Sequence, residues 1–190
     1  MKNLPNQFFY SKEEDRLNVI SHGIGFILSM IGLIFLLNKG LQDFNLLRFL
    51  SFLIYGISLS TMYIASTLYH NSKTPEGRYK FRLFDMVSIY LLIAGSYTPF
   101  TLTVLIDSGG LTLFLLVWVI AFFGIIWKIF TVGSYNISST LLYIFMGGLW
   151  LFFIDAFINE IPQNALVWIY ASFLTYLICF FFYLADSKVK

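Results

Sequence analysis

Charge is scarce in this sequence. Asp, Glu, Lys and Arg make up only 12% of its 190 residues, whereas 58% of the residues are hydrophobic and 20% are aromatic. A typical soluble domain is about 25% charged. A water-exposed globule of this size could not bury so much apolar surface, so the composition excludes a soluble protein and favours one that lies in a membrane.

Cysteine is almost absent, because Cys179 is the only one in the chain. A disulfide joins two cysteines, so none can form within the chain. We interpret Cys179 as a packing residue of the last apolar segment.

The few charges divide the chain into six apolar runs, each of at least twenty residues. A helix that crosses a membrane needs about 20 such residues. Short connections with Gly, Pro, Asn and Ser separate the runs and require neighbouring helices to pack antiparallel. The sequence therefore predicts an all-α integral membrane protein, a bundle of six transmembrane helices that forms one domain over residues 1–190. We predict these helices at about 17–38, 48–71, 84–106, 110–130, 138–158 and 164–185.

The basic residues are distributed unevenly between the two ends of the predicted bundle. Six crossings place both termini on one side, and that side carries ten of the twelve Lys and Arg residues, all except Lys39 and Arg48. Short basic loops stay in the cytoplasm. We therefore expect a multi-pass protein of the cell membrane, the inner membrane, with cytoplasmic N- and C-termini. Topology explains the basic residues, so we expect no nucleic-acid partner.

A small polar group interrupts the apolar pattern in "ASTLYHNS" at 65–72. Ser66 and His70 lie one helical turn apart on the same face of the second helix, near its cytoplasmic end. Asp85, at the start of the third helix, should lie at the same depth, because the two helices are antiparallel neighbours. Ionisable groups at such a depth usually face the bundle interior with a partner. His22 lies at a depth from which it could join them.

This spacing leaves several interpretations open. A histidine and a carboxylate could bind a metal ion, whose bound water has a pKa near 7 and is a usable nucleophile. A structural hydrogen bond between His70 and Asp85 is the alternative, and Asp85 could also pair with Arg82 three residues before it. His22 could be an ordinary hydrogen-bonding or interfacial residue.

Three segments resemble the haemolysin III family, the bacterial branch of the progestin and adipoQ receptor superfamily: "EEDRLNVISHGIGFILS" at 13–29, "ASTLYHNS" at 65–72 and "FRLFDMVSIYLLIAGSYTPF" at 81–100. The resemblance implies a seven-helix bundle with a cytoplasmic N-terminus. It also implies a zinc ion near the cytoplasmic face and hydrolysis of a lipid amide such as ceramide. Carried over to this sequence, His70 is a zinc ligand, Asp85 binds the zinc-bound water or the metal, and Ser66 supports the site.

The sequence also departs from the family pattern. In the family, a seventh helix with an H-x-x-x-H motif supplies two further zinc ligands, whereas this chain reads as six helices and contains only His22 and His70. Bacterial members tend to have a histidine where Met86 stands. We therefore expect an incomplete metal site, with zinc bound weakly or not at all, and His22 as the one further candidate ligand.

Two functions follow from the resemblance. The first is a zinc-dependent lipid-amide hydrolase or a protein derived from one, with Ser66 and Asp85 as catalytic residues and His70 and Asp85 as metal ligands. The alternative is a non-catalytic membrane protein, a haemolysin that affects membrane integrity or lipid homeostasis. The predicted helices contain no line of charged residues across the bilayer, so the sequence does not indicate a channel or transporter.

Overall fold

The computed structural model describes residues 10–42, 45–132 and 136–187. Within these ranges, six helical spans are long and apolar enough to cross a membrane. The predicted all-α membrane fold with six transmembrane helices is therefore confirmed.

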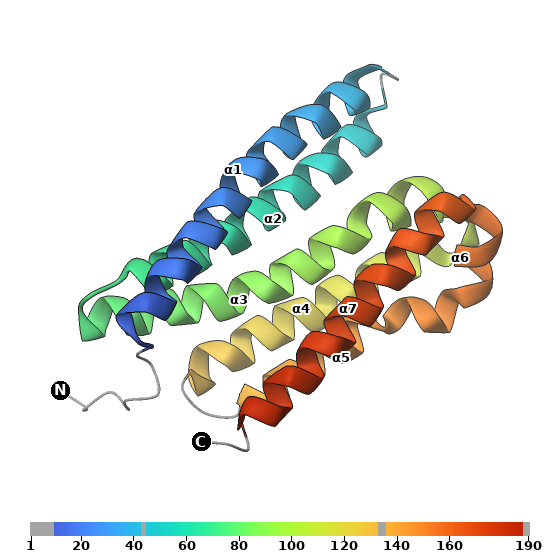
Figure 1. Cartoon of the computed structure of the whole chain (residues 1–190). Helices are drawn as coiled ribbons and strands as arrows, with labels where there is room; N and C mark the ends of the chain where they lie inside the picture. The colour runs from blue at the N-terminus through green and yellow to red at the C-terminus, as the bar shows by residue number, and fades with distance from the viewer. Residues whose placement is uncertain (1–9, 43–44, 133–135, 188–190) are drawn as a thin grey trace.

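The spans follow one another in antiparallel order (Figure 1). Helix α1 packs along α2, α2 packs along α3, and α3 packs on α4, while α7 contacts α5 and α6. The elements are α1 Lys12–Gln42, α2 Leu46–Asn71, α3 Pro75–Pro99, the π-helical turns η2 Phe100–Val104 and η3 Ile106–Gly110, α4 Leu111–Thr131, α5 Asn136–Gly147, the 3₁₀ turn η4 Leu149–Phe153, α6 Ile154–Glu160 and α7 Gln163–Ser187.

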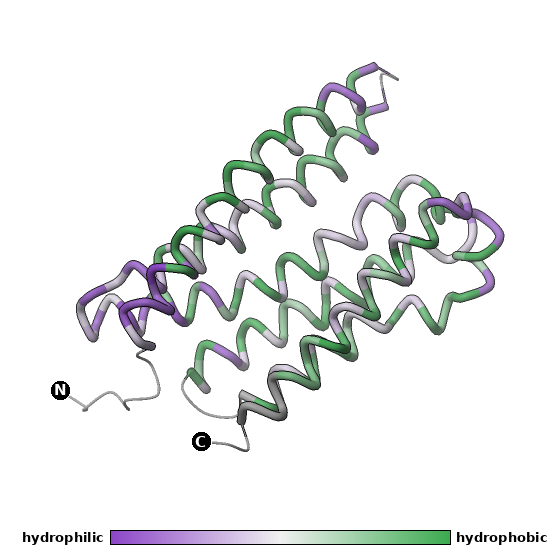
Figure 2. Tube along the Cα trace, viewed as in Figure 1, coloured by the Kyte–Doolittle hydropathy of each residue, from purple (hydrophilic) through white to green (hydrophobic). Residues whose placement is uncertain are grey.

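One end of the bundle gathers the beginnings of α1 and α3 and the ends of α2, α4 and α7 (Figure 1). We call it the polar end, because hydrophilic residues concentrate there on α1, α2 and α3, whereas the middle of each helix is predominantly hydrophobic (Figure 2). The start of α1 and the end of α7 lie at this same end, as an even number of crossings requires.

Helix α1 begins five residues before the predicted start at Leu17. Ser11 and Glu14 form a reciprocal cap, in which the Ser11 amide donates to Glu14 Oε2 at 2.9 Å and the Glu14 amide donates to Ser11 Oγ at 3.2 Å. Acidic residues in the first turn also interact favourably with the helix dipole. The prediction of the start at 17 was wrong because charge was taken as the boundary, whereas the cap lets the helix extend beyond the apolar run.

Helix α3 begins at Pro75, nine residues before the predicted start at 84. Its first turns occupy a segment that the charge pattern marked as a connection. Thr74 is the N-cap and accepts a hydrogen bond from the Gly77 amide, and Pro75 stands at the first helical position. Proline is well suited to that position, because its fixed φ matches the helix and its missing N–H would have had no partner there. The consequence is that Arg78 and Arg82 lie on a helix.

The third span is helical as far as Pro99 and continues in two π-helical turns. Proline lacks the amide that the helix would need at this point. The hydroxyl of Thr98 donates to the Ala94 carbonyl and that of Thr101 to the Tyr97 carbonyl, each at 2.9 Å. Gly109 has a φ of +88°, which glycine adopts without strain, so the chain turns here into α4.

The fifth span is not the single helix predicted for 138–158. Helix α5 ends at Gly147, and a 3₁₀ turn leads into α6. Tyr97 provides a hydrogen-bond partner for the backbone groups that the break leaves unpaired. Its hydroxyl lies 3.0 Å from the Met146 carbonyl and 2.9 Å from the Gly147 carbonyl, and it accepts a hydrogen bond from the Trp150 amide at 3.2 Å. Backbone groups need such partners inside a membrane, where water cannot supply them.

Two kinds of packing hold the bundle together. Large apolar side chains fill the space among α3, α4, α5, α6 and α7, with Tyr90, Leu113 and Met146 fully buried. The contact between α1 and α2 instead uses small residues and hydroxyls, such as the buried Ser29–Ser60 hydrogen bond of 2.9 Å. Small residues let the two helix backbones approach closely, and this sets how the polar ends of α1 and α2 meet.

Candidate functional site

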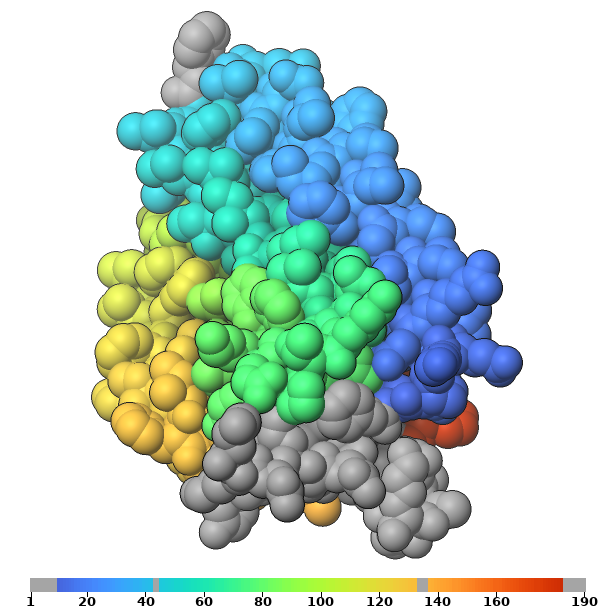
Figure 3. Space-filling model, turned by 90° about the vertical axis from the view of Figure 1, so that its left-hand side faces the viewer, coloured from blue at the N-terminus to red at the C-terminus, as the bar shows by residue number. Residues whose placement is uncertain are grey.

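The polar end brings the α2–α3 junction into contact with the start of α1. Viewed from this side, the junction, in green, lies between α1, in blue, and α4 and α5, in yellow and orange (Figure 3). His70 belongs to the last turn of α2, and its side chain is only 9% exposed.

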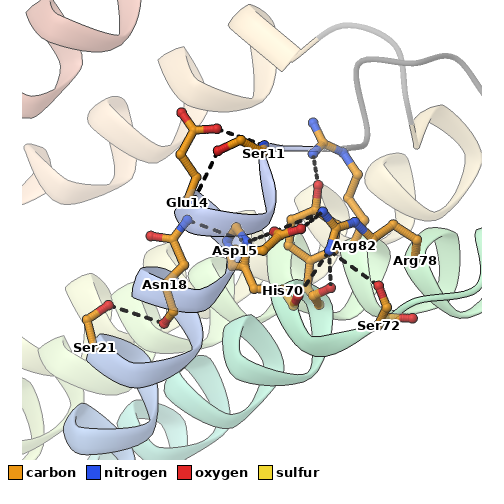
Figure 4. A network of polar contacts seen from close by, with 10 residues as sticks. Ser11, Glu14, Asp15, Asn18, Ser21, His70, Ser72, Arg78 and Arg82 are labelled. Atoms are coloured by element: carbon orange, nitrogen blue, oxygen red, sulfur yellow. Dashed lines mark hydrogen bonds and ion pairs between the residues drawn. The ribbon is translucent and has the colours of Figure 1, made fainter.

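Asp15 of α1 is the closest polar partner of His70. Its Oδ1 lies 2.9 Å from Nδ1 of the His70 imidazole. The Asn18 amide nitrogen lies at 3.5 Å from the same Nδ1, a much longer contact. Figure 4 shows Asp15 between the imidazole of His70 and the guanidinium of Arg78.

Arg78 of α3 binds both oxygens of the Asp15 carboxylate through Nη2, at 2.9 Å and 2.7 Å (Figure 4). Its Nη1 donates to the carbonyls of Tyr69, His70 and Ser72 at the end of α2, at 3.0, 3.1 and 3.4 Å. Carbonyls at the end of a helix lack partners within it, and a cation there is favoured by the helix dipole. Arg78 therefore joins the ends of three helices.

Ser66 lies one turn before His70 on α2, and Asp85 belongs to the neighbouring helix α3. The Asp85 carboxyl interacts with the Ser66 side chain and lies within electrostatic range of His70 and Arg82. Ser66 is buried, and Arg82 donates to the Tyr69 hydroxyl at 2.8 Å. The structure thus brings together the three residues that the sequence placed at one depth.

His22 joins the cluster from α1. Its ring stacks on that of His70, with the ring centroids 6.0 Å apart and the planes only 7° apart, and it also lies against Tyr63. The depth expected from the sequence agrees with this position.

Sequence reasoning missed Asp15 and Arg78. It placed Asp15 before the first helix and Arg78 in a connection, so neither side chain could be assigned to a helix face. Once α1 begins at Lys12, Asp15, Asn18 and His22 fall three and four residues apart on one helix face, a spacing visible in the sequence. Lys128, in the last turn of α4, is fully buried and donates to Ser139 at 3.1 Å.

The described residues do not complete a site for the zinc ion that the resemblance implies. Within residues 10–42, 45–132 and 136–187, no three His, Cys, Asp or Glu side chains are placed so that they could hold a metal ion. A zinc site uses three or four protein ligands. The pair His70 and Asp85 is therefore too small a donor set.

Comparison with known proteins decides the family. The profile described as "Haemolysin-III related" matches residues 10–189. The chain belongs to the haemolysin III family. It is 42% identical over 139 residues to "Hemolysin-3" of Bacillus cereus and 38% identical over 145 residues to "Hemolysin-3 homolog" of Bacillus subtilis (strain 168).

These alignments cover 73% and 76% of this chain but 63% and 67% of the two Bacillus proteins. No solved structure matches the chain. The haemolysin III resemblance read from the three sequence segments is therefore confirmed, and two of those segments contribute His70, Ser66 and Asp85 to the polar end.

Proposed function

We propose that this haemolysin III protein acts on a membrane lipid at its polar end, as a lipid-amide hydrolase whose reacting groups are His70, Asp85 and Ser66. One observation supports the proposal: a carboxylate lies 2.9 Å from Nδ1 of His70, in the last turn of α2, where Ser66 lies one turn earlier and Asp85 lies on the adjoining helix α3. Ionisable groups at membrane depth are costly and are usually functional. With six apolar spans in a bilayer, we expect this cluster to lie where the polar part of a lipid can approach it.

The chemistry assigned to these residues is acid–base catalysis. Nε2 of His70 would take a proton from an attacking water as the water oxygen bonds to the carbonyl carbon of the lipid amide. The same nitrogen would return that proton to the amine as the carbon–nitrogen bond breaks. The Asp85 carboxylate, beside Ser66, would accept a hydrogen bond from the water and orient it.

Zinc takes no part in this sequence of steps. His70 and Asp85 supply two ligands among the described residues, and three are needed for a stable site. The family resemblance implies a zinc ion. In this chain, the residues that would face such an ion are His70, Asp85 and His22.

The site would face the cytoplasm of a cell whose plasma membrane holds the protein. Lys12, Arg16, Lys73, Arg78, Lys80, Arg82 and Lys128 all lie toward the polar end, and basic residues are retained on the cytoplasmic side. The lipid substrate would then be one that reaches the inner leaflet.

Hydrolysis is tested with purified protein in liposomes that contain ceramide, with release of the fatty acid as the readout. Acid–base groups contribute about 10²–10⁴-fold to rate, so His70→Gln and Asp85→Asn should each lower the rate by at least about 100-fold. Asp155→Asn changes an exposed carboxylate on α6, at the opposite end of the bundle, and should leave the rate unchanged.

A wild-type protein that releases no fatty acid would overturn this function. The second candidate, lysis or weakening of membranes, is favoured by the names of the two Bacillus relatives. A dye trapped in the same liposomes distinguishes them: leakage that persists in Asp85→Asn while hydrolysis is absent from wild type supports the lytic function.

A further inference from the structure

The side chains of Asp15, His70 and Arg78 form a chain of contacts across three helices. The Asp15 carboxylate lies 2.9 Å from His70 Nδ1, and both of its oxygens are bound by Arg78. These contacts join residues 55 and 63 positions apart in the sequence, so they exist only in the folded protein. The hydrolysis described above assigns no step to Asp15 or Arg78.

The contact with Asp15 determines which nitrogen of His70 carries the proton. An ionised carboxylate only accepts hydrogen bonds, so a neutral imidazole at 2.9 Å must present an N–H at Nδ1. The Asn18 amide, at 3.5 Å, is too distant to compete as a donor to that nitrogen. With the proton on Nδ1, the lone pair of the ring is on Nε2.

Arg78 determines where the Asp15 carboxylate stands. Its Nη2 contacts both oxygens, and its Nη1 donates to the carbonyls of Tyr69 and His70. The carboxylate is thereby held relative to the same helix end that carries the imidazole. Arg78 is only 1% exposed, so its guanidinium is shielded from water.

We infer that Asp15, held by Arg78, is the positioning residue that fixes His70 in its Nδ1–H form and leaves Nε2 as the basic nitrogen of the site. The orientation of a histidine by a carboxylate is a common way to prepare the opposite nitrogen for chemistry. The use of Nε2 in catalysis rests on the proposed function, whereas the position of the proton does not.

The proton is located by ¹⁵N NMR of histidine-labelled protein in lipid nanodiscs at about pH 8.5, where an ordinary imidazole with a pKa of about 6.5 is neutral. The chain contains two histidines, so the His22→Gln variant assigns the remaining signals to His70. We expect a protonated, pyrrole-type Nδ1 and an unprotonated, pyridine-type Nε2 in the wild type.

Asp15→Asn removes the carboxylate with little change in shape. In this variant, we expect the ¹⁵N chemical shifts of His70 to move toward those of the Nε2–H tautomer, which the free histidine side chain prefers. Asp15→Glu retains a carboxylate, so His70 should keep the shifts of the Nδ1–H tautomer. Glu14→Gln is the matched control, because it removes the same charge one residue earlier on α1, where the side chain caps the helix at Ser11. Its His70 spectrum should equal that of the wild type.

The kinetic readout separates positioning from folding. In liposomes, Asp15→Asn should lower kcat by at least about 10-fold with KM nearly unchanged, and Asp15→Glu should recover part of the loss. A wild-type His70 that is mainly protonated at Nε2, or one whose signals do not respond to Asp15→Asn, overturns the inference. If the NMR result is as expected but the wild type hydrolyses no lipid amide, the positioning role stands and the proposed function fails.

Discussion

Arg78 is a buried cation in a protein with few charges. A buried charge is tolerated only when it is paired and hydrogen-bonded, because its removal from water costs several kcal/mol. Arg78 meets this condition with the Asp15 carboxylate, two carbonyls of α2 and the carbonyl of its C-cap Ser72. The same contacts that allow its burial also hold α1 against α2 beside His70, so stability and the geometry of the site depend on one residue.

Substitution of Arg78 should destabilise the protein strongly. Arg78→Gln leaves Asp15 without the guanidinium nitrogen that contacts both of its oxygens, and it leaves the carbonyls at the end of α2 without their donor. We expect a loss of about 2–3 kcal/mol in the free energy of unfolding, somewhat below the 3–5 kcal/mol typical of fully buried pairs, because Asp15 is 22% exposed. The measurement is thermal unfolding in detergent.

Lys80→Gln is the control for this measurement, since it removes an exposed positive charge from the same helix. In a double-mutant cycle, Asp15→Asn combined with Arg78→Gln should cost less than the sum of the single losses, because the two side chains share one interaction. Strictly additive losses would refute the coupling.

Helices α1 and α2 approach each other closely at glycine and serine positions. A Cβ at Gly25 would overlap the Tyr63 ring, and a Cβ at Gly56 would overlap Leu33. In a membrane, where lipid is as apolar as leucine, such close packing is a main source of helix association. Tyr63 also lies against His22, whose ring stacks on that of His70, so this contact adjoins the candidate site.

Two glycines of α1 allow a matched test of this contact. Gly25→Ala should lower the unfolding temperature, because the new methyl group displaces the Tyr63 ring. Gly32→Ala adds the same atom where nothing lies within 4 Å, and it should leave stability unchanged or raise it by up to about 1 kcal/mol through helix propensity. Thermal unfolding of both variants is the measurement, and equal behaviour of the two would contradict close packing at Gly25.

The whole molecule is a bundle of six spans whose two ends differ in charge. The polar end holds the site and most of the described basic residues, whereas Asp107, Asp155 and Glu160 lie at the opposite end, where Ser108 donates to Glu160 at 3.0 Å. Translocation of basic segments is unfavourable, so this asymmetry favours the polar end in the cytoplasm. The site would then be reached by lipids of the inner leaflet.

Orientation is tested by labelling single cysteines in intact cells. In a Cys179→Ser background, Lys73→Cys places an exposed thiol at the polar end and Asn159→Cys places one at the opposite end. A membrane-impermeant maleimide should label the Asn159→Cys variant in intact cells and the Lys73→Cys variant only after permeabilisation. The reverse pattern would place the polar end outside the cell.

Much of the fold could be predicted from the sequence, because the bilayer demands local properties. Length and apolarity are read from neighbouring residues, and they located all six spans. The boundaries at Lys12 and Pro75 were less predictable, since caps extend these helices into charged segments. The break after Gly147 depends on Tyr97, about 50 residues away, so the apolar pattern did not reveal it.

The candidate site divides in the same way. Ser66 and His70 share a face because they lie one turn apart, and an antiparallel neighbour at equal depth carries Asp85, so the sequence could predict these positions, whereas the roles of the three residues stay predictions. The roles of Asp15 and Arg78 arise only in the tertiary structure, because a carboxylate on α1 meets an imidazole on α2 and a guanidinium on α3 only after the helices pack. Local periodicity dictates which residues share a helix face, whereas helix packing decides which faces meet.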